Sequence, residues 1–563
     1  MALIQINNLN FTYSGEKEKV LSGLNLTIEQ GEFVVLCGSS GSGKTTLLKN
    51  LKREISPAGK MTGDVFYKGI PLNELQDEVS AKEIGMVFQD PDSQIVMDTV
   101  IQELAFSLEN FGYKPAYIKK KISEMVTFFG LEECLHKSVQ ELSGGQKQTM
   151  NICSVMLLEP RVLLLDEPTS QLDPVAAHEL IKMVHQINQE FSVTVIISEH
   201  RLEQLFPIAD RVVFMEEGSI KYCNTPVELS MEVMKAKDSK AVPFIPPLTR
   251  LFFTLPTGRD ERLVSDIPLS VRSGKQFMQR ISQSFNECSE NEENFENSHK
   301  NSADCGNAII TCKDVSFRYD REKSLILKKL SLKIYQGEFM AILGGNGAGK
   351  TTLLQAMAGL ISPQQGCVYL RKKRIALIKQ DEKNASIGYV AQNPLLHFTF
   401  DTVNEELKFA SLYSRSNSSN TKMEEMLELF EMKDLLDRHP YDLSGGQQQK
   451  LVIACALIPE PEILMIDEPT KGLDSISKDN LARLLKSLKA KGITIVMVTH
   501  DIEFAACHAE KCAMLFDGSI TDYSSPSEFF SGNYFYTTSI NRAVRDYLPH
   551  AITCEDVMKA CRF

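Results

Sequence analysis

Two glycine-rich stretches decide the fold: "GSSGSGKTT" at residues 38–46 and "GGNGAGKTT" at residues 344–352. Both fit the pattern G-x-x-x-x-G-K-[ST], in which glycines let the backbone curl so that successive N–H groups point at an anion. The apolar runs "EFVVLCG" and "EFMAILGG" lead into them, and "KTTLLKNL" and "KTTLLQAM" follow. We therefore expect two strand–loop–helix units that bind phosphate groups. A glycine-rich turn without a ligand is a fair alternative for one copy, but not for two equivalent copies.

The chain is an internal duplication. "LSGGQ" begins at Leu142 and Leu443, and "DEPT" begins at Asp166 and Asp467. These pairs and the glycine loops recur with a period of about 300 residues. We predict a first domain at 1–235 with a C-terminal extension at 236–283, a linker at 284–307, and a second domain with its own extension at 308–563. The linker is rich in Asn, Glu and Ser and is expected to be disordered.

Composition narrows the class of protein. Of 563 residues, 43% are hydrophobic, as in a globular protein, and the formal net charge is −12, which argues against a nucleic-acid partner. No run reaches the roughly 18 apolar residues that a membrane-spanning helix needs. The 13 cysteines form no metal-like cluster, and we expect small core residues in a reducing compartment. A thiol reagent that reached Cys37 would disturb the first glycine loop.

Two pairs of acids follow strand-like apolar runs, Asp166-Glu167 after "VLLL" and Asp467-Glu468 after "ILMI". The runs are apolar on both faces, like buried parallel strands, and chemistry belongs at the carboxyl ends of such strands. A surface turn is therefore the weaker reading of "DEP". The first acid of each pair suits Mg²⁺, and the second can orient and deprotonate a water molecule.

The glycine loops add the remaining phosphate chemistry. Lys44 and Lys350 can reach the β- and γ-phosphates, and the hydroxyls of Thr45 and Thr351 can hold Mg²⁺. In "LSGGQ", a serine and two glycines open a helix, which is a second kind of anion site.

The ordered set of glycine loop, Gln, LSGGQ, DEP and His resembles the ATP-binding cassette (ABC) ATPases over nearly the whole chain. The resemblance implies an α/β fold of two P-loop NTPase cassettes. Each would have a RecA-like, mostly parallel sheet core, an antiparallel β subdomain and a helical subdomain that carries LSGGQ. In that family two cassettes pair head to tail, and each ATP lies between the glycine loop of one cassette and the LSGGQ of the other. Duplication would supply both halves of each site.

The resemblance also implies roles for individual residues. The catalytic residues would be Glu167, His200, Gln89, Glu468, His500 and Gln392. The Mg²⁺ ligands would be Thr45, Gln89, Asp166, Thr351, Gln392 and Asp467. The first glycine loop would bind ATP through Gly38, Ser39, Ser40, Gly41, Ser42, Gly43, Lys44, Thr45 and Thr46, and the second through Gly344, Gly345, Asn346, Gly347, Ala348, Gly349, Lys350, Thr351 and Thr352. The signature turns would contribute Ser143, Gly144, Gly145, Gln146, Ser444, Gly445, Gly446 and Gln447.

Other positions match the family less specifically. Tyr13 and Tyr319 match the aromatic residue that stacks on adenine, and a core aromatic is the alternative for each. Asp173 and Asp474 match the loop that signals between sites. Neither half lacks its lysine, glutamine, acids or histidine, so we predict that both sites hydrolyse ATP. Two departures from the family pattern leave room for unequal rates at the two sites. His200 lies in "SEH" where the family more often has "TH", and Thr149, after the first LSGGQ, stands where many members have Arg.

The stretch "VFQDPDSQIVMDTVIQELAF" (87–106) is similar to the Gln loop of energy-coupling factor (ECF) ATPases and their cobalt- and nickel-importer relatives. This resemblance implies a peripheral motor subunit on the cytoplasmic face of the membrane. Its partners would be a T-type membrane scaffold and a substrate-binding membrane protein, docked beside Gln89 and Gln392. The alternative is a soluble tandem ABC ATPase of the ribosome-associated type, but that class has a long, charged helical linker instead of the Asn-rich one here.

Overall fold

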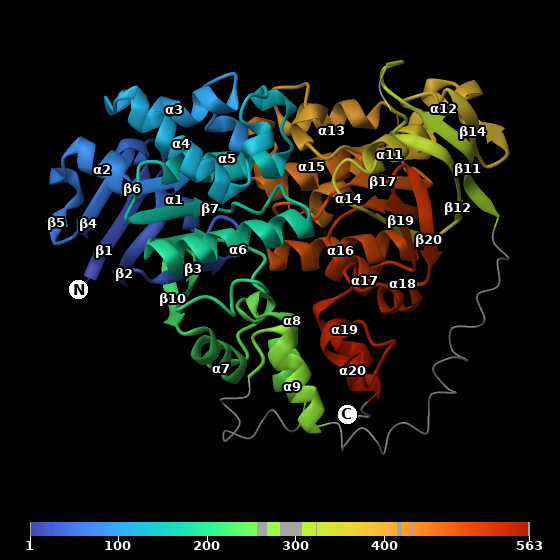
Figure 1. Cartoon of the computed structure of the whole chain (residues 1–563). Coiled ribbons are helices and arrows are strands. Elements are labelled where there is room, and N and C mark those ends of the chain that lie inside the picture. Colours follow the sequence, from blue (N-terminus) through green and yellow to red (C-terminus); the bar gives the residue numbers. More distant parts are fainter. Residues whose placement is uncertain are drawn as a thin grey trace. The chain divides into compact units, whose positions relative to one another are not determined.

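The computed structural model describes residues 2–255, 267–281, 307–322, 324–413, 419–430 and 432–560. The predicted linker at 284–307 lies outside these residues except for Asn307. The chain divides into two compact units (Figure 1). The first unit comprises Met1–Ser270 and Asp474–Ile476, and the second comprises Val271–Leu473 and Ser477–Phe563.

The first unit contains two β-sheets. A four-stranded antiparallel sheet has the order β2-β1-β4-β5, and a six-stranded sheet has the order β10-β9-β3-β8-β7-β6. In the larger sheet only the β9–β10 pair is antiparallel, and the other pairs are parallel. The strands are β1 (Ala2–Tyr13), β2 (Leu21–Glu29), β3 (Phe33–Gly38), β4 (Gly59–Tyr67), β5 (Ile70–Pro71), β6 (Ile84–Val87), β7 (Val162–Asp166), β8 (Thr194–Ser198), β9 (Arg211–Glu216) and β10 (Ser219–Asn224).

Helices complete the first cassette. They are α1 (Lys44–Asn50), α2 (Asp77–Glu83), α3 (Val100–Asn110), α4 (Pro115–Phe129), α5 (Gly144–Met156), α6 (Pro174–Phe191), α7 (Pro226–Ala236) and α8 (Pro247–Thr254). Every residue of β3 is buried, and its side chains alternate between two cores. Phe33 and Val35 pack in the core that includes α5 and α6, whereas Val34 and Leu36 pack with α1 and the antiparallel sheet. This two-sided burial explains why the strand reads as a continuous apolar run.

The second unit repeats this plan. Its sheets have the orders β12-β11-β14-β15 and β16-β17-β18-β13-β19-β20. The strands are β11 (Ala308–Phe317), β12 (Leu327–Tyr335), β13 (Phe339–Leu343), β14 (Gln365–Leu370), β15 (Lys373–Arg374), β16 (Ile387–Val390), β17 (Ile463–Asp467), β18 (Thr494–Val498), β19 (Lys511–Phe516) and β20 (Ser519–Ser524). The helices are α11 (Lys350–Ala358), α12 (Gln380–Ser386), α13 (Val403–Ser411), α14 (Ser419–Leu429), α15 (Gly445–Leu457), α16 (Ser475–Ala490), α17 (Ile502–His508) and α18 (Pro526–Gly532).

Further helices close the second unit: α9 (Val271–Ile281), α19 (Ser539–Val544) and α20 (Cys554–Ala560). Helix α9 precedes the second cassette in sequence, yet it packs against α19, and Lys275 Nζ lies 2.9 Å from Asp546. Within the described ranges, no helix has the length and apolar character that crossing a membrane requires. The expected α/β architecture, with a mostly parallel core sheet and an antiparallel sheet in each half, is confirmed.

Candidate functional site

The first glycine loop connects β3 to α1 in a conformation that depends on its glycines. Gly38 has φ 144° and Gly43 has φ 96°, values that residues with a side chain rarely adopt. A Cβ on Gly38 would lie 2.2 Å from the carbonyl oxygen of Met215, and one on Gly43 would lie 2.7 Å from Leu21. The second loop has the same curl, with Gly344 at φ 156° and Gly349 at φ 98°. The backbone conformation of each loop therefore requires glycine at these positions.

The lysine that follows each loop reaches back over it. Lys44 is 5% exposed, and its Nζ donates to the carbonyl oxygens of Gly38 (2.8 Å) and Ser39 (3.0 Å). Lys350 makes the equivalent bonds to Gly344 (2.9 Å) and Gly345 (3.0 Å). Burial lowers the pKa of Lys44, and nearby carboxylates, Glu167 foremost, oppose this shift. Each lysine ammonium thus lies over its glycine loop. An anion bound in the loop could accept the hydrogen bonds that the ammonium now donates to the loop carbonyl oxygens.

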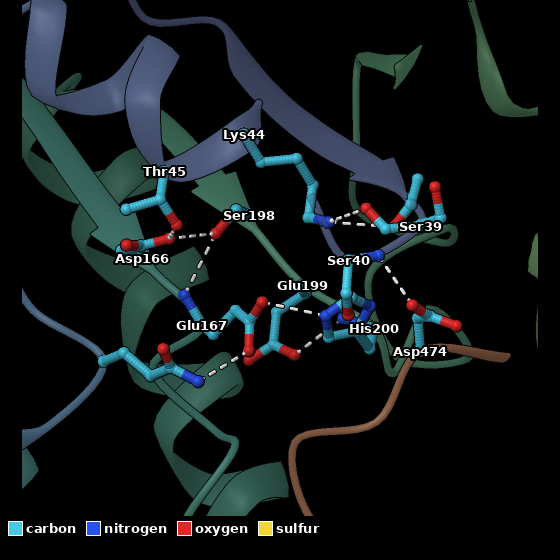
Figure 2. A network of polar contacts seen from close by, with 12 residues as sticks. Ser39, Ser40, Lys44, Thr45, Asp166, Glu167, Ser198, Glu199, His200 and Asp474 are labelled. Atoms are coloured by element: carbon cyan, nitrogen blue, oxygen red, sulfur yellow. Dashed lines mark hydrogen bonds and ion pairs between the residues drawn. The ribbon is translucent and has the colours of Figure 1, made fainter. Parts of the chain in front are cut away.

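A hydroxyl and a carboxylate meet beside the first loop. Thr45 Oγ1 donates to Asp166 Oδ1 at 3.0 Å, and Ser198 Oγ donates to the same oxygen at 2.7 Å (Figure 2). Asp166 is 4% exposed, and burial raises its pKa. In the second unit, burial raises the pKa of Asp467 to about 6. The hydrogen bond from the Thr351 side chain lowers this pKa, but by less than burial raises it. Hydroxyl and carboxylate oxygens are the ligands that Mg²⁺ prefers, so both donor sets fit that ion.

The second acid of each pair faces a histidine. His200 Nε2 lies 2.8 Å from Glu167 Oε1, and Gln89 Nε2 donates to Glu167 Oε2 at 2.9 Å. Burial alone would raise the pKa of Glu167, but the hydrogen bond from His200, with its charge and that of Lys44, holds it below its ordinary value. The lowered pKa favours the ionised form of the glutamate, which could accept a proton.

The second unit repeats this pair. His500 Nδ1 lies 2.6 Å from Glu468 Oε2, and Lys350 Nζ lies 3.9 Å from Glu468 Oε1. Gln392 follows β16 as Gln89 follows β6, and its side chain is exposed. Both glutamates have positive φ, 43° for Glu167 and 51° for Glu468, which is strained for a residue with a Cβ. The duplication repeats this backbone conformation in both halves.

The two LSGGQ motifs open the helices α5 and α15. Ser143 caps α5, with Gln146 N donating to Ser143 Oγ at 3.3 Å and Ser143 N donating to Gln146 Oε1 at 2.9 Å. Ser444 and Gln447 form the same capping box on α15. Both serines are exposed, so these helix N-termini can be reached by an anion.

The hydroxyls of the two predicted adenine-stacking tyrosines contact the helices that follow the glycine loops. Tyr13 Oη lies 2.9 Å from Thr46 Oγ1, and Tyr319 Oη lies 3.2 Å from Thr352 Oγ1. Tyr319 is 61% exposed, so the alternative of a core aromatic does not describe it. Tyr13 is half-buried and packs edge-on against Phe11.

The two aspartates of the predicted signalling loop take different partners. Asp173 caps α6 by accepting from the backbone N–H groups of Val175 and Ala176. Asp474 lies in the first unit, where its carboxylate accepts from Ser40 N at 2.6 Å.

The family model described as ABC transporter matches residues 21–170 and 327–471, which together make up more than half of the chain. The chain belongs to the ABC transporter family. Each half is an ABC cassette that binds ATP, and the chain is an ABC ATPase. The matched ranges include both glycine loops, both LSGGQ motifs and both acid pairs.

Individual proteins show the same relationship. A Bacillus cereus protein named "Putative ABC transporter ATP-binding protein" is 45% identical over 561 residues, covering 100% of this chain and 98% of its own. A Clostridium tetani protein of the same name is 33% identical, covering 79% of this chain and 96% of its own. The structure of cbiO1 from Clostridium perfringens, described as part of the ABC transporter complex cbiONQ, is 30% identical with a TM-score of 0.38. It covers 42% of this ABC ATPase and 95% of the cbiO1 chain.

Motif reasoning noted the "SEH" departure in the first ABC cassette but gave no role to Ser198 or Glu199. Ser198 Oγ bonds Asp166 and also accepts from Glu167 N at 3.1 Å, so it touches both acids. Glu199 is 2% exposed and accepts three hydrogen bonds. The available signal was the difference between "TVIISEH" and "TIVMVTH" in the two repeats.

Proposed function

We propose that this ABC ATPase is the motor subunit of an ECF-type membrane importer. The observation that carries the proposal is the complete set of hydrolytic groups in both cassettes, because a motor with two working sites needs each of them. Glu167 pairs with His200 at 2.8 Å, and Glu468 pairs with His500 at 2.6 Å. The stretch at 87–106, which resembles the Gln loop of ECF ATPases, supports the choice of transporter class.

In each site, different groups of the chain bind the phosphates, hold Mg²⁺ and accept the proton. The backbone of the glycine loop cradles the phosphates, and Lys44 or Lys350 exchanges its loop carbonyls for phosphate oxygens. Thr45 with Asp166, and Thr351 with Asp467, would hold Mg²⁺, which supplies positive charge to the phosphates. Glu167 or Glu468 accepts a proton from the attacking water, while the histidine orients the carboxylate.

We infer from the family pattern that the sites are composite. Ser444 and Gly446 would complete the site of Lys44 and Glu167, and Ser143 and Gly145 would complete the other. The capped helices behind these serines offer free N–H groups and a positive helix end to the γ-phosphate. ATP then draws the cassettes together, and hydrolysis with phosphate release lets them part.

The membrane partners would dock beside the Gln loops, at the cytoplasmic face of the membrane. A cavity of about 260 Å³ lies in the second unit between the segment after Gln392 and α13, lined by His397, Phe409 and Tyr413 among others. On α13 and the turn after it, Leu412 is 75% exposed and Phe409 is 42% exposed. Phe409 lines the cavity, and this partly apolar hollow with exposed apolar residues on α13 and the turn after it suits an amphipathic helix from a membrane protein.

Co-purification from detergent-solubilised membranes tests this function. The expected result is recovery of a multi-span scaffold and a small substrate-binding membrane protein with the ATPase, and weaker recovery with Leu412→Asp. ATP binding by Leu412→Asp, measured in parallel, checks that the cassette keeps its fold. Sedimentation of the chain with ribosomes, with no membrane protein recovered, would contradict the proposal and favour the soluble alternative.

A further inference from the structure

The two cassettes differ at the end of the strand that carries the histidine. The last residue of β8 and the two that follow it are Ser198-Glu199-His200, whereas the last residue of β18 and the two that follow it are Val498-Thr499-His500. Glu199 is a nearly fully buried carboxyl group in a place where the other cassette has a small hydroxyl. No role in phosphate or metal binding accounts for it.

The carboxylate of Glu199 joins two segments of the first site. Its Oε1 accepts from Thr169 N at 2.8 Å and from Thr169 Oγ1 at 2.6 Å. Its Oε2 accepts from His200 N at 3.0 Å (Figure 2). Thr169 follows Glu167 by two residues. Glu199 therefore links the turn that presents the catalytic glutamate to the turn that presents the histidine.

Among the described residues of the second cassette, Thr499 makes a different set of contacts. Thr499 Oγ1 lies 3.3 Å from Thr470 Oγ1 and accepts from Asp501 N at 3.0 Å. One longer contact thus stands where Glu199 makes two short ones to Thr169. Burial raises the pKa of Glu199, and the hydrogen bonds from Thr169 oppose that shift. The second site is held differently, because His500 N donates directly to Glu468 Oε2 at 3.2 Å.

We propose that Glu199 is a positioning residue that fixes Glu167 against His200, so that the two ATP sites are kinetically unequal. This rests on the proton-acceptor role proposed above for Glu167. Glu167 has φ 43°, a conformation that persists only when its surroundings hold it. Small displacements of a catalytic group cost much of its rate, so loosening this turn slows hydrolysis more than it weakens ATP binding.

Vanadate trapping of a photoreactive ATP analogue, with labelled peptides assigned by mass spectrometry to each cassette, reads the two sites separately. Glu199→Thr copies the residue of the second cassette, and Thr499→Ser is the matched control. We expect Glu199→Thr to lower diphosphate adduct in the first cassette about tenfold. We expect Thr499→Ser to change the second cassette less than about twofold. Glu199→Gln keeps the size and the bonds to Thr169 and should show a smaller loss.

Equilibrium binding of a fluorescent ATP analogue and thermal melting distinguish positioning from folding. Binding and melting close to those of the parent, with trapping lost at the first site only, support the inference. Unchanged trapping overturns it, and so does a loss of binding and melting temperature in proportion to trapping. Glu167→Gln is the reference variant. If hydrolysis at the first site survives Glu167→Gln, the assignment of Glu167 as the base is wrong. If Glu167→Gln abolishes hydrolysis there but Glu199→Thr does not lower it, only the role proposed for Glu199 is wrong.

Discussion

His200 Nε2 lies 2.8 Å from Glu167 Oε1, and the two side chains are 8% and 12% exposed. The pair joins the end of β8 to the end of β7, two adjacent parallel strands. Water attacking a phosphate at this edge would meet an ionised carboxylate whose direction is fixed by the imidazole. In the second unit the equivalent pair meets through the other ring nitrogen, with His500 Nδ1 2.6 Å from Glu468 Oε2.

Replacing both glutamates should separate ATP binding from hydrolysis. The double variant Glu167→Gln with Glu468→Gln keeps the size of the side chains but cannot accept the proton of the attacking water. We expect turnover to fall by at least about a hundredfold while ATP remains bound. Steady-state phosphate release and filter binding measure the two quantities. Turnover at the parental rate would show that another group is the base.

The exposed face of Tyr319 should contribute to adenine binding. Its hydroxyl contacts Thr352, so Tyr319→Phe removes that contact and keeps the ring, while Tyr319→Ala removes both. A stacked base is worth about 1–3 kcal/mol, so Tyr319→Ala should raise the dissociation constant of ATP at the second site about fivefold or more. Tyr319→Phe should bind within about twofold of the parent. Equal losses in both variants would assign the effect to the hydroxyl and contradict stacking.

Cys37 should be inert although it adjoins the first glycine loop. It is 1% exposed, and burial raises its pKa to about 12, so the thiol stays protonated below pH 11. Because only the thiolate reacts, alkylation at pH 8 should leave Cys37 unmodified and label the exposed Cys507. Mass spectrometry after iodoacetamide treatment of the folded protein measures both. Rapid labelling of Cys37 would mean that the strand β3 opens readily.

Much of the fold could be predicted from the sequence because its signals are local. The apolar run before the first loop became β3, and the run before Asp166 became β7, since two-sided burial leaves a continuous apolar pattern. The glycine pattern predicted the loop between β3 and α1, because the positive φ at Gly38 and Gly43 excludes other residues.

Contacts between distant segments were beyond the reach of sequence reasoning. The bond between Glu199 and Thr169 joins residues 30 positions apart, and neither belongs to a phosphate-binding pattern. The packing of α9 on α19 brings together segments that no periodicity relates. The positive φ of Glu167 could not be predicted either, because glutamate has no particular preference for positive φ.

If each cassette borrows the signature turn of the other, the substitution Gly446→Asp should act on the site of the opposite cassette. The position has room, since an added Cβ would meet its nearest neighbour, Leu473, at 4.0 Å, and an aspartate there would repel phosphate. Gly145→Asp is the reciprocal change. With vanadate-trapped nucleotide mapped to each cassette, Gly446→Asp should abolish trapping at the glycine loop of Lys44 and lower it less at that of Lys350. Loss confined to the loop of Lys350, within the same cassette as Gly446, would contradict the account.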